Sequence, residues 1–159
     1  MPIDWPAPPF ALRDTRDSRV ALEDFRGRAV VIAFYVADWH PVASSELALY
    51  QQLHPELDRL GASVLGISVD GTWSHAAFAK ASGIDFPLLA DDEPPGAVAR
   101  AYRVYRPAIG RSRHAQFVID PAGLVRWSGT FPDALNPGVD AVLKALEALH
   151  VDRSAERPR

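Results

Sequence analysis

The chain has 159 residues, a length that fits one domain with a single hydrophobic core. Hydrophobic residues make up 48% of it and charged residues 23%, values typical of a globular protein rather than a disordered or fibrous one. Its 17 Lys and Arg are scattered and outnumbered by 20 Asp and Glu, so the charge pattern predicts no nucleic-acid partner and no membrane partner. The N-terminus has no recognisable signal peptide, and we therefore expect a cytoplasmic protein.

The first third of the chain predicts three strands and a helix. Short strands are expected at 10–12 and 20–22, joined by a polar turn. A β-branched and aromatic run over 29–35 suits a strand buried on both faces. Apolar residues at steps of three and four then predict a helix over 43–60, which Pro55 should kink or divide in two.

The middle of the chain repeats this alternation with shorter elements. A second buried strand is predicted over 62–69, followed by a short helix over 73–82 that Gly83 should end. A brief strand over 86–90 and a helix over 95–102, with proline in its first turn, come next. Strand–helix–strand units of this kind favour parallel pairing.

The last part of the chain predicts a hairpin and a terminal helix. Strands over 114–120 and 124–128 flank a Pro-Ala-Gly turn, and apolar residues on one face predict a helix over 137–149. The polar residues 151–159 are expected to form a frayed tail. Together these elements predict an α/β fold with a mixed central sheet and helices on both faces, formed by a single domain over 1–150.

The segment 34–47 reads Phe-Tyr-Val-Ala-Asp-Trp-His-Pro-Val-Ala-Ser-Ser-Glu-Leu and joins a predicted strand to a predicted helix. It resembles the active-site segment of peroxiredoxins, the alkyl hydroperoxide reductase C/thiol-specific antioxidant family. Further fragments similar to this family, the last of them typical of its one-cysteine bacterial branch, lie at 24–27, 64–70, 86–91, 117–121 and 136–140. The resemblance implies a thioredoxin-like fold in the peroxiredoxin arrangement. It also implies a homodimer, because many family members dimerise.

The residues that carry the family's chemistry are changed in this chain. The family signature is Pro, three residues, Thr or Ser, two residues and Cys, with an Arg three residues before the Phe of the Phe-Val-Ile-Asp strand. At those positions stand Val36, His40, Ala43 and His114, with Arg113 as a second candidate for the Arg. A peroxiredoxin cysteine attacks peroxide as a thiolate, which the helix N-terminus and the Arg stabilise. Since the chain has no cysteine at all, thiol peroxidase activity is predicted to be absent.

Two origins of Ala43 are open. It is either a natural divergence or an engineered replacement of cysteine in an antioxidant thiol peroxidase. A designer would change the cysteine alone, whereas Val36, His40 and His114 are changed as well. The sequence therefore favours natural divergence.

The resemblance implies that one pocket is lined by His40, Ala43, Ser44, Glu46, His114, Trp39 and Arg113. Three interpretations of its two histidines stay open. They fill polar space left by the family residues, or, with the helix N-terminus, they bind a small anion or acidic molecule in a regulatory relic. In the third, His40 and His114 hold a divalent metal together with Glu46 or Asp38, or perform acid–base chemistry in a repurposed enzyme. No other cofactor is expected.

The remaining histidines and tryptophans are given structural roles. Surface positions are predicted for His54, His75 and His150. Core or dimer-interface positions are predicted for Trp5, Trp73 and Trp127. The acidic run 91–93 is interpreted as a solvated loop, because no calcium-binding spacing follows it.

Overall fold

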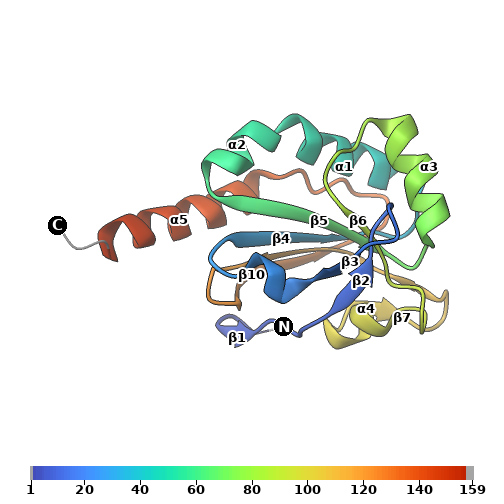
Figure 1. The fold of residues 1–159 in the computed structure, drawn as a ribbon, viewed down its shortest axis with the longest axis horizontal. Helices are drawn as coiled ribbons and strands as arrows, with labels where there is room; N and C mark the ends of the chain where they lie inside the picture. The colour runs from blue at the N-terminus through green and yellow to red at the C-terminus, as the bar shows by residue number, and fades with distance from the viewer. Residues whose placement is uncertain (1, 157–159) are drawn as a thin grey trace.

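A mixed sheet of eight strands forms the centre of the structure, a computed structural model that describes residues 2–156 (Figure 1). In chain order its strands are β1 (Trp5–Pro6), β2 (Ala11–Arg13), β3 (Arg19–Ala21), β4 (Ala29–Phe34), β5 (Ala62–Ser68), β6 (Leu88–Ala90), β9 (His114–Ile119) and β10 (Leu124–Phe131). Their order across the sheet is β1-β10-β9-β4-β5-β6-β2-β3. A separate hairpin is formed by β7 (Tyr105–Arg106) and β8 (Arg111–Ser112).

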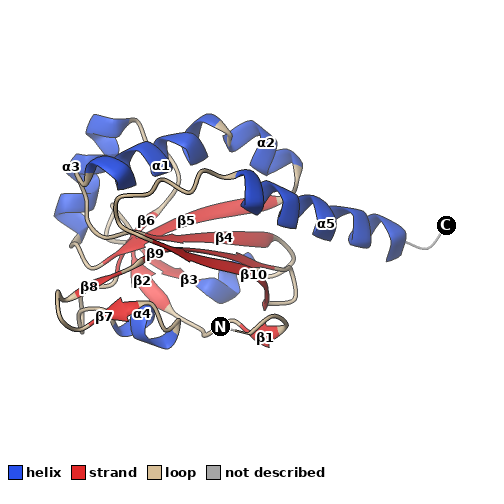
Figure 2. Cartoon of the chain, turned by 180° about the vertical axis from the view of Figure 1, so that it is seen from behind, coloured by secondary structure: helices blue, strands red, loops and turns tan. Residues whose placement is uncertain are grey.

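Helices cover both faces of this sheet. In chain order they are η1 (Leu22–Phe25), α1 (Pro41–Gln52), α2 (His54–Arg59), α3 (Thr72–Ser82), α4 (Ala97–Ala101) and α5 (Asp140–Glu156). Figure 2 shows α1, α2, α3 and α5 on one side of the sheet and α4 on the other. The predicted α/β fold with a mixed sheet and helices on both faces is confirmed.

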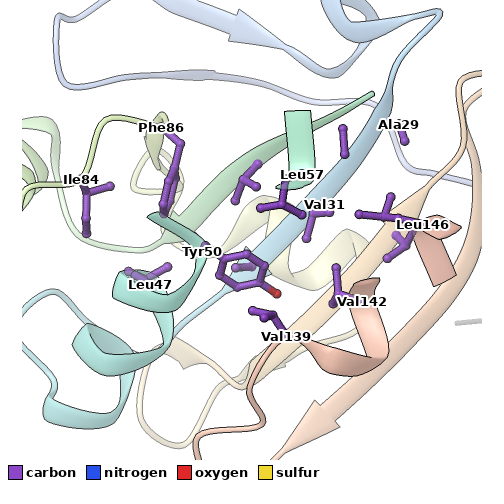
Figure 3. Packing of buried hydrophobic residues seen from close by; sticks show 14 of the residues in the cluster. Ala29, Val31, Leu47, Tyr50, Leu57, Ile84, Phe86, Val139, Val142 and Leu146 are labelled. Atoms are coloured by element: carbon purple, nitrogen blue, oxygen red, sulfur yellow. The ribbon is translucent and has the colours of Figure 1, made fainter. Parts of the chain in front are cut away.

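Strand β4 is the centre of the core. It runs parallel to β5 and antiparallel to β9, and all six of its residues are buried, as the apolar run predicted. Because side chains alternate between the faces of a strand, Val31 packs with Leu47 of α1 and Val142 of α5 (Figure 3). Ile32, its neighbour, packs on the opposite face with Val98 of α4. Residues of α1 are thereby fixed against the end of β4.

The predicted helix over 43–60 is two helices. The first ends at Gln52 and the second begins at His54, with Pro55 in its first turn. Proline lacks the N–H that a helix interior needs, but in a first turn that N–H has no partner to lose. The division at Pro55 is confirmed, and Pro41 starts α1 in the same way.

The C-terminal elements extend further than predicted. Strand β10 continues to Phe131, three residues past the expected end, because Thr130 and Phe131 pair with the start of β9. Helix α5 begins at Asp140, after Gly138 with its left-handed φ of 67°, and continues to Glu156. Part of the predicted frayed tail is therefore helical, and residues 157–159 lie outside the described residues. Within the described part of the chain, no helix is long and apolar enough to cross a bilayer.

Candidate functional site

The first turn of α1 carries the changed signature residues. His40 is the N-cap of this helix, and its Nδ1 accepts a hydrogen bond of 3.3 Å from the Ala43 backbone N–H. The Ser44 hydroxyl donates to the His40 carbonyl at 2.9 Å. An N-cap side chain satisfies one of the backbone donors that a helix start leaves free. The backbone N–H of Ala43 therefore bonds to the His40 imidazole and is not available to a ligand.

His114 lies beside this cap. It is the first residue of β9, and its ring centroid is 5.4 Å from that of His40, with 59° between the ring planes. Both His114 and Ala43 have 0% of their surface exposed. Nδ1 of His114 is 3.4 Å from Oε2 of Glu46, within ion-pair distance, but these two atoms and Nε2 of His114 have no hydrogen-bond partner. The fold thus brings four predicted site residues together around an incompletely bonded imidazole.

Further buried polar groups continue the site below Glu46. Its Oε1 accepts a hydrogen bond of 3.0 Å from Gln116, which also donates to the Gly138 carbonyl at 2.9 Å. The Tyr50 hydroxyl, one turn further along α1, is buried without a partner, and burial together with the Glu46 charge raises its pKa well above the usual value. An unsatisfied buried polar group costs about 1–3 kcal/mol, so these unpaired groups lower the stability of the folded protein.

The other predicted site residues are less closely associated with the two rings. Val36 is buried, and its carbonyl accepts a hydrogen bond of 3.2 Å from Arg111. Trp39 is 55% exposed and packs edge-on against Phe78 of α3, with 5.3 Å between the ring centroids. Arg113 is exposed and borders a surface hollow with Arg106, Thr130, Phe131, Pro132 and Asp133.

His75 was predicted at the surface, and this prediction is wrong. It is fully buried in the first turn of α3, where its Nδ1 lies 2.8 Å from Oδ2 of Asp38. Its Nε2 lies 3.1 Å from the Leu89 carbonyl. The sequence does contain a signal: His75 precedes the apolar Phe78 by three residues, which places both on one face of a helix. A polar residue there is not excluded from the core when it has a buried partner.

Three side chains bond to the Asp38 carboxylate, two of them from α3 and one from Tyr35, the residue after β4. Besides His75, the carboxylate accepts hydrogen bonds from the Tyr35 hydroxyl at 2.7 Å and the Ser74 hydroxyl at 2.8 Å. Burial raises the pKa of Asp38, but the hydrogen bond and charge of His75, with the two hydroxyls, lower it further, so the net pKa is below the usual value. Burial and the Asp38 charge hold the pKa of Tyr35 well above 10. The cluster is therefore a carboxylate surrounded by donors.

Asp91 also departs from the prediction of a solvated loop over 91–93. It is buried, and its carboxylate accepts 2.9 Å hydrogen bonds from the backbone N–H groups of Val98 and Ala99 in α4. Asp91 acts as a cap for this short helix, which has no capping side chain at Gly96. Burial raises its pKa. Asp92 and Glu93 are exposed, as predicted.

The two imidazoles are close enough to share a metal ion, which the sequence left as one interpretation. Bonds of about 2.1 Å to each ring would allow centroids up to about 7 Å apart, and the distance is 5.4 Å. A protein metal site needs at least a third side-chain ligand beside the two imidazoles. Over residues 2–156, no three His, Cys, Asp or Glu side chains are grouped as metal ligands. Asp38, one candidate for the third ligand, is bound by His75 instead.

Comparisons with known proteins agree on one family. The sequence model of the AhpC/TSA family matches residues 3–128. A peroxiredoxin of Thermotoga maritima is 30% identical over 149 residues, covering 89% of this chain and 68% of the relative. Alkyl hydroperoxide reductase E of Mycobacterium tuberculosis is 34% identical over 123 residues, covering 77% of this chain and 80% of that protein.

Solved structures show the same fold. The crystal structure of AhpC from Enterococcus faecalis has a TM-score of 0.88 and 27% identity, and the match covers 99% of this chain and 97% of that one. The crystal structure of peroxidoxin BcpB from Mycobacterium tuberculosis has a TM-score of 0.85 and 28% identity, covering 94% and 98%. The thioredoxin-like fold in the peroxiredoxin arrangement, which the sequence predicted, is confirmed.

Proposed function

Because the chain belongs to the AhpC/TSA family and contains no cysteine, we propose that it is a peroxiredoxin-like protein without thiol peroxidase activity that binds a small anion. The observation that carries the proposal is His114. Its imidazole is completely buried, lies beside the N-cap of α1, and has no hydrogen-bond partner on either ring nitrogen. The protein would then be a ligand-binding or regulatory relic that retains an altered peroxidase site.

The loss of peroxidase activity rests on the chemistry of three positions. Ala43 has no lone pair with which to attack a peroxide oxygen. The backbone N–H of Ala43, which would help to stabilise a thiolate, donates to His40 instead. His114 stands at the position of the family's permanently charged Arg, and its Nδ1 lies 3.4 Å from Oε2 of Glu46. The whole thiolate-stabilising arrangement is altered, and not the nucleophile alone.

The burial of the site limits the size of its ligand. Ala43 and His114 have no exposed surface, so a ligand that reaches them can have only a few heavy atoms. Glu46 occupies the Nδ1 side of His114, which leaves Nε2 as the donor for the ligand. The positive end of the α1 dipole, near His40, favours an anion over a cation. A monocarboxylate such as formate meets these conditions.

Titration with formate tests this proposal. Imidazole ¹H–¹⁵N resonances of His40 and His114 should shift and saturate together as formate is added to the wild-type protein. The variant His114→Gln should lose the saturating shift, whereas His54→Gln, which changes an exposed histidine of α2, should retain it. Unchanged resonances in the wild-type protein, or equal shifts in the His114→Gln variant, would contradict anion binding at this site.

The absence of peroxidase activity has its own test. Purified protein with hydrogen peroxide and a dithiol reductant should consume peroxide no faster than buffer does. Robust turnover that depends on the protein would refute the inactive-peroxidase proposal, whatever the titration shows.

The proximity of the two rings supports a second candidate, a metal or acid–base site at His40 and His114. Metal analysis of protein purified without chelators distinguishes it from the anion site. A stoichiometric divalent metal that is lost in both His40→Ala and His114→Ala would replace the first proposal with this one. Metal-free protein would leave the anion site in place.

We also propose that the protein is a cytoplasmic homodimer that associates through Trp39 and Trp73. These side chains are 55% and 90% exposed. Each tryptophan is next in sequence to one partner of the hydrogen bond that Ser74 donates to Asp38. Exposed aromatic residues are typical of the centres of protein interfaces. In sedimentation analysis Trp73→Ser should be monomeric and the wild-type protein dimeric, while Trp5→Ser, a matched change at an exposed tryptophan of β1, should stay dimeric. A monomeric wild-type protein would contradict the dimer.

A further inference from the structure

We propose that His75 is a positioning residue: through Asp38 it holds the segment 38–40 so that the His40 ring caps α1 and faces His114. The three residues of this segment have three different environments. Asp38 is bound by α3, Trp39 lies at the surface, and His40 begins the site. Any movement of Asp38 is passed to His40 through only two peptide units.

Two buried contacts fix the orientation of the His75 ring. Both ring nitrogens of His75 face acceptors, Nδ1 the Asp38 carboxylate and Nε2 the Leu89 carbonyl of β6. The imidazole therefore connects the loop after β4 to the middle of β6. The side chains of His75 and Asp38 are 0% and 1% exposed, so water does not compete for these bonds.

The other groups that face Asp38 support the same placement. The hydroxyls of Tyr35 and Ser74 donate to its carboxylate, and its own backbone N–H donates to Asp70 at 2.8 Å. Asp70 is in turn bound by the Ser68 hydroxyl at 2.7 Å and by Arg111 at 3.2 Å. The loop is thus held from α3, β5 and β8. Among the described side chains that bond to the Asp38 carboxylate, His75 is the one that also bonds to β6.

Trp39 shows why such support is needed. Its φ of 70° lies in the left-handed region, which residues other than glycine adopt at a cost in free energy. A strained residue of this kind persists when its neighbours are fixed on both sides. Asp38 is fixed by α3 and His40 by α1, and Trp39 packs on Phe78 of α3. Releasing Asp38 would let Trp39 relax and turn His40 away from the cap.

Amide hydrogen exchange at Ala43 tests the proposal directly, because that N–H is the donor to His40. In the variant His75→Gln, which cannot reach both acceptors, exchange at Ala43 should accelerate by about 2- to 30-fold, the factor that corresponds to the loss of an N-cap. The imidazole resonances of His40 should move as well. Exchange in α5, which packs against β9 and β10, should change less than exchange at Ala43.

Two further variants make the outcome decisive. Ser74→Ala removes the hydrogen bond that the residue before His75 donates to Asp38. This milder variant replaces His75→Gln if the latter does not fold. It should also accelerate exchange at Ala43. His54→Gln is the control and should leave it unchanged. Unaltered Ala43 exchange and His40 resonances in His75→Gln, with only a lower thermal stability, would overturn the positioning role.

This test is independent of any ligand, although the importance of His75 for binding rests on the proposed function. If formate binds the wild-type protein, His75→Gln should weaken its binding together with the change at Ala43. If formate does not bind but Ala43 exchange accelerates, the anion proposal fails and the positioning role stands.

Discussion

Replacement of Asp38 by asparagine should be among the most destabilising polar substitutions in the protein. The carboxylate accepts three side-chain hydrogen bonds, from Tyr35, Ser74 and His75. Each hydrogen bond to a charged group contributes about 1.5–3 kcal/mol, but such bonds share one acceptor and do not add. We therefore take the value for one such bond, about 1.5–3 kcal/mol, as the expected loss in the free energy of unfolding. For a chain of this size it corresponds to a decrease in Tm of about 3–12 °C.

Urea denaturation followed by tryptophan fluorescence measures this loss. The matched control is Asp58→Asn, which breaks an exposed ion pair with Arg28 at 3.4 Å and should cost less than about 1 kcal/mol. A loss for Asp38→Asn no larger than that of the control would refute the reasoning, because the buried carboxylate would then contribute no more than an exposed one.

The same carboxylate predicts the response to acid. Its pKa is lowered in the folded protein, so its contribution is complete above the unfolded value, about 3.9, and is lost as the pH falls through the lower folded value. The wild-type protein should therefore lose stability in this range more steeply than Asp38→Asn does. Parallel stability curves for the two proteins below about pH 4 would contradict the assigned direction of the pKa shift.

Three other substitutions examine the site, the core and a helix cap. Ala43→Cys should restore little peroxide reduction, since His40 takes the backbone donor at that position and His114 replaces the Arg; turnover well above that of the free dithiol would show otherwise. Leu47→Ala, at a fully buried position between α1 and β4, should lower the free energy of unfolding by about 2–5 kcal/mol in urea denaturation. Asp91→Ala should cost about 0.5–2 kcal/mol and increase amide exchange at Val98 and Ala99; unchanged exchange at both amides would count against its capping role.

Local sequence patterns predicted most of the elements, but not where all of them end. The buried run at β4 and the division of α1 from α2 at Pro55 follow from side-chain type and from the missing proline N–H. The start of α5 was placed too early, because Pro137 is a good first-turn residue whereas Gly138 adopts a left-handed φ that delays the helix to Asp140. Strand β10 was predicted too short, because its end depends on pairing with β9.

The sequence likewise predicted only part of the candidate site. The first turn of α1, with His40 and Ala43, was found from residues that are close in sequence. Asp38 and His75 are 37 residues apart, and the pairing that removes His75 from the surface could not be read from either segment. The same holds for Gln116, which reaches Glu46 from 70 residues away.

The peroxiredoxin arrangement was predicted from the resemblance of sequence segments to that family, and the lack of a sulfur nucleophile follows from residue identity alone. Tertiary packing was needed to show that His114 is buried beside His40 and Glu46, and that Asp38 is bound by His75. These contacts depend on the order of strands in the sheet, which brings β6 and the start of β9 near the end of β4. A buried polar group is stabilised only by the partners that this arrangement provides.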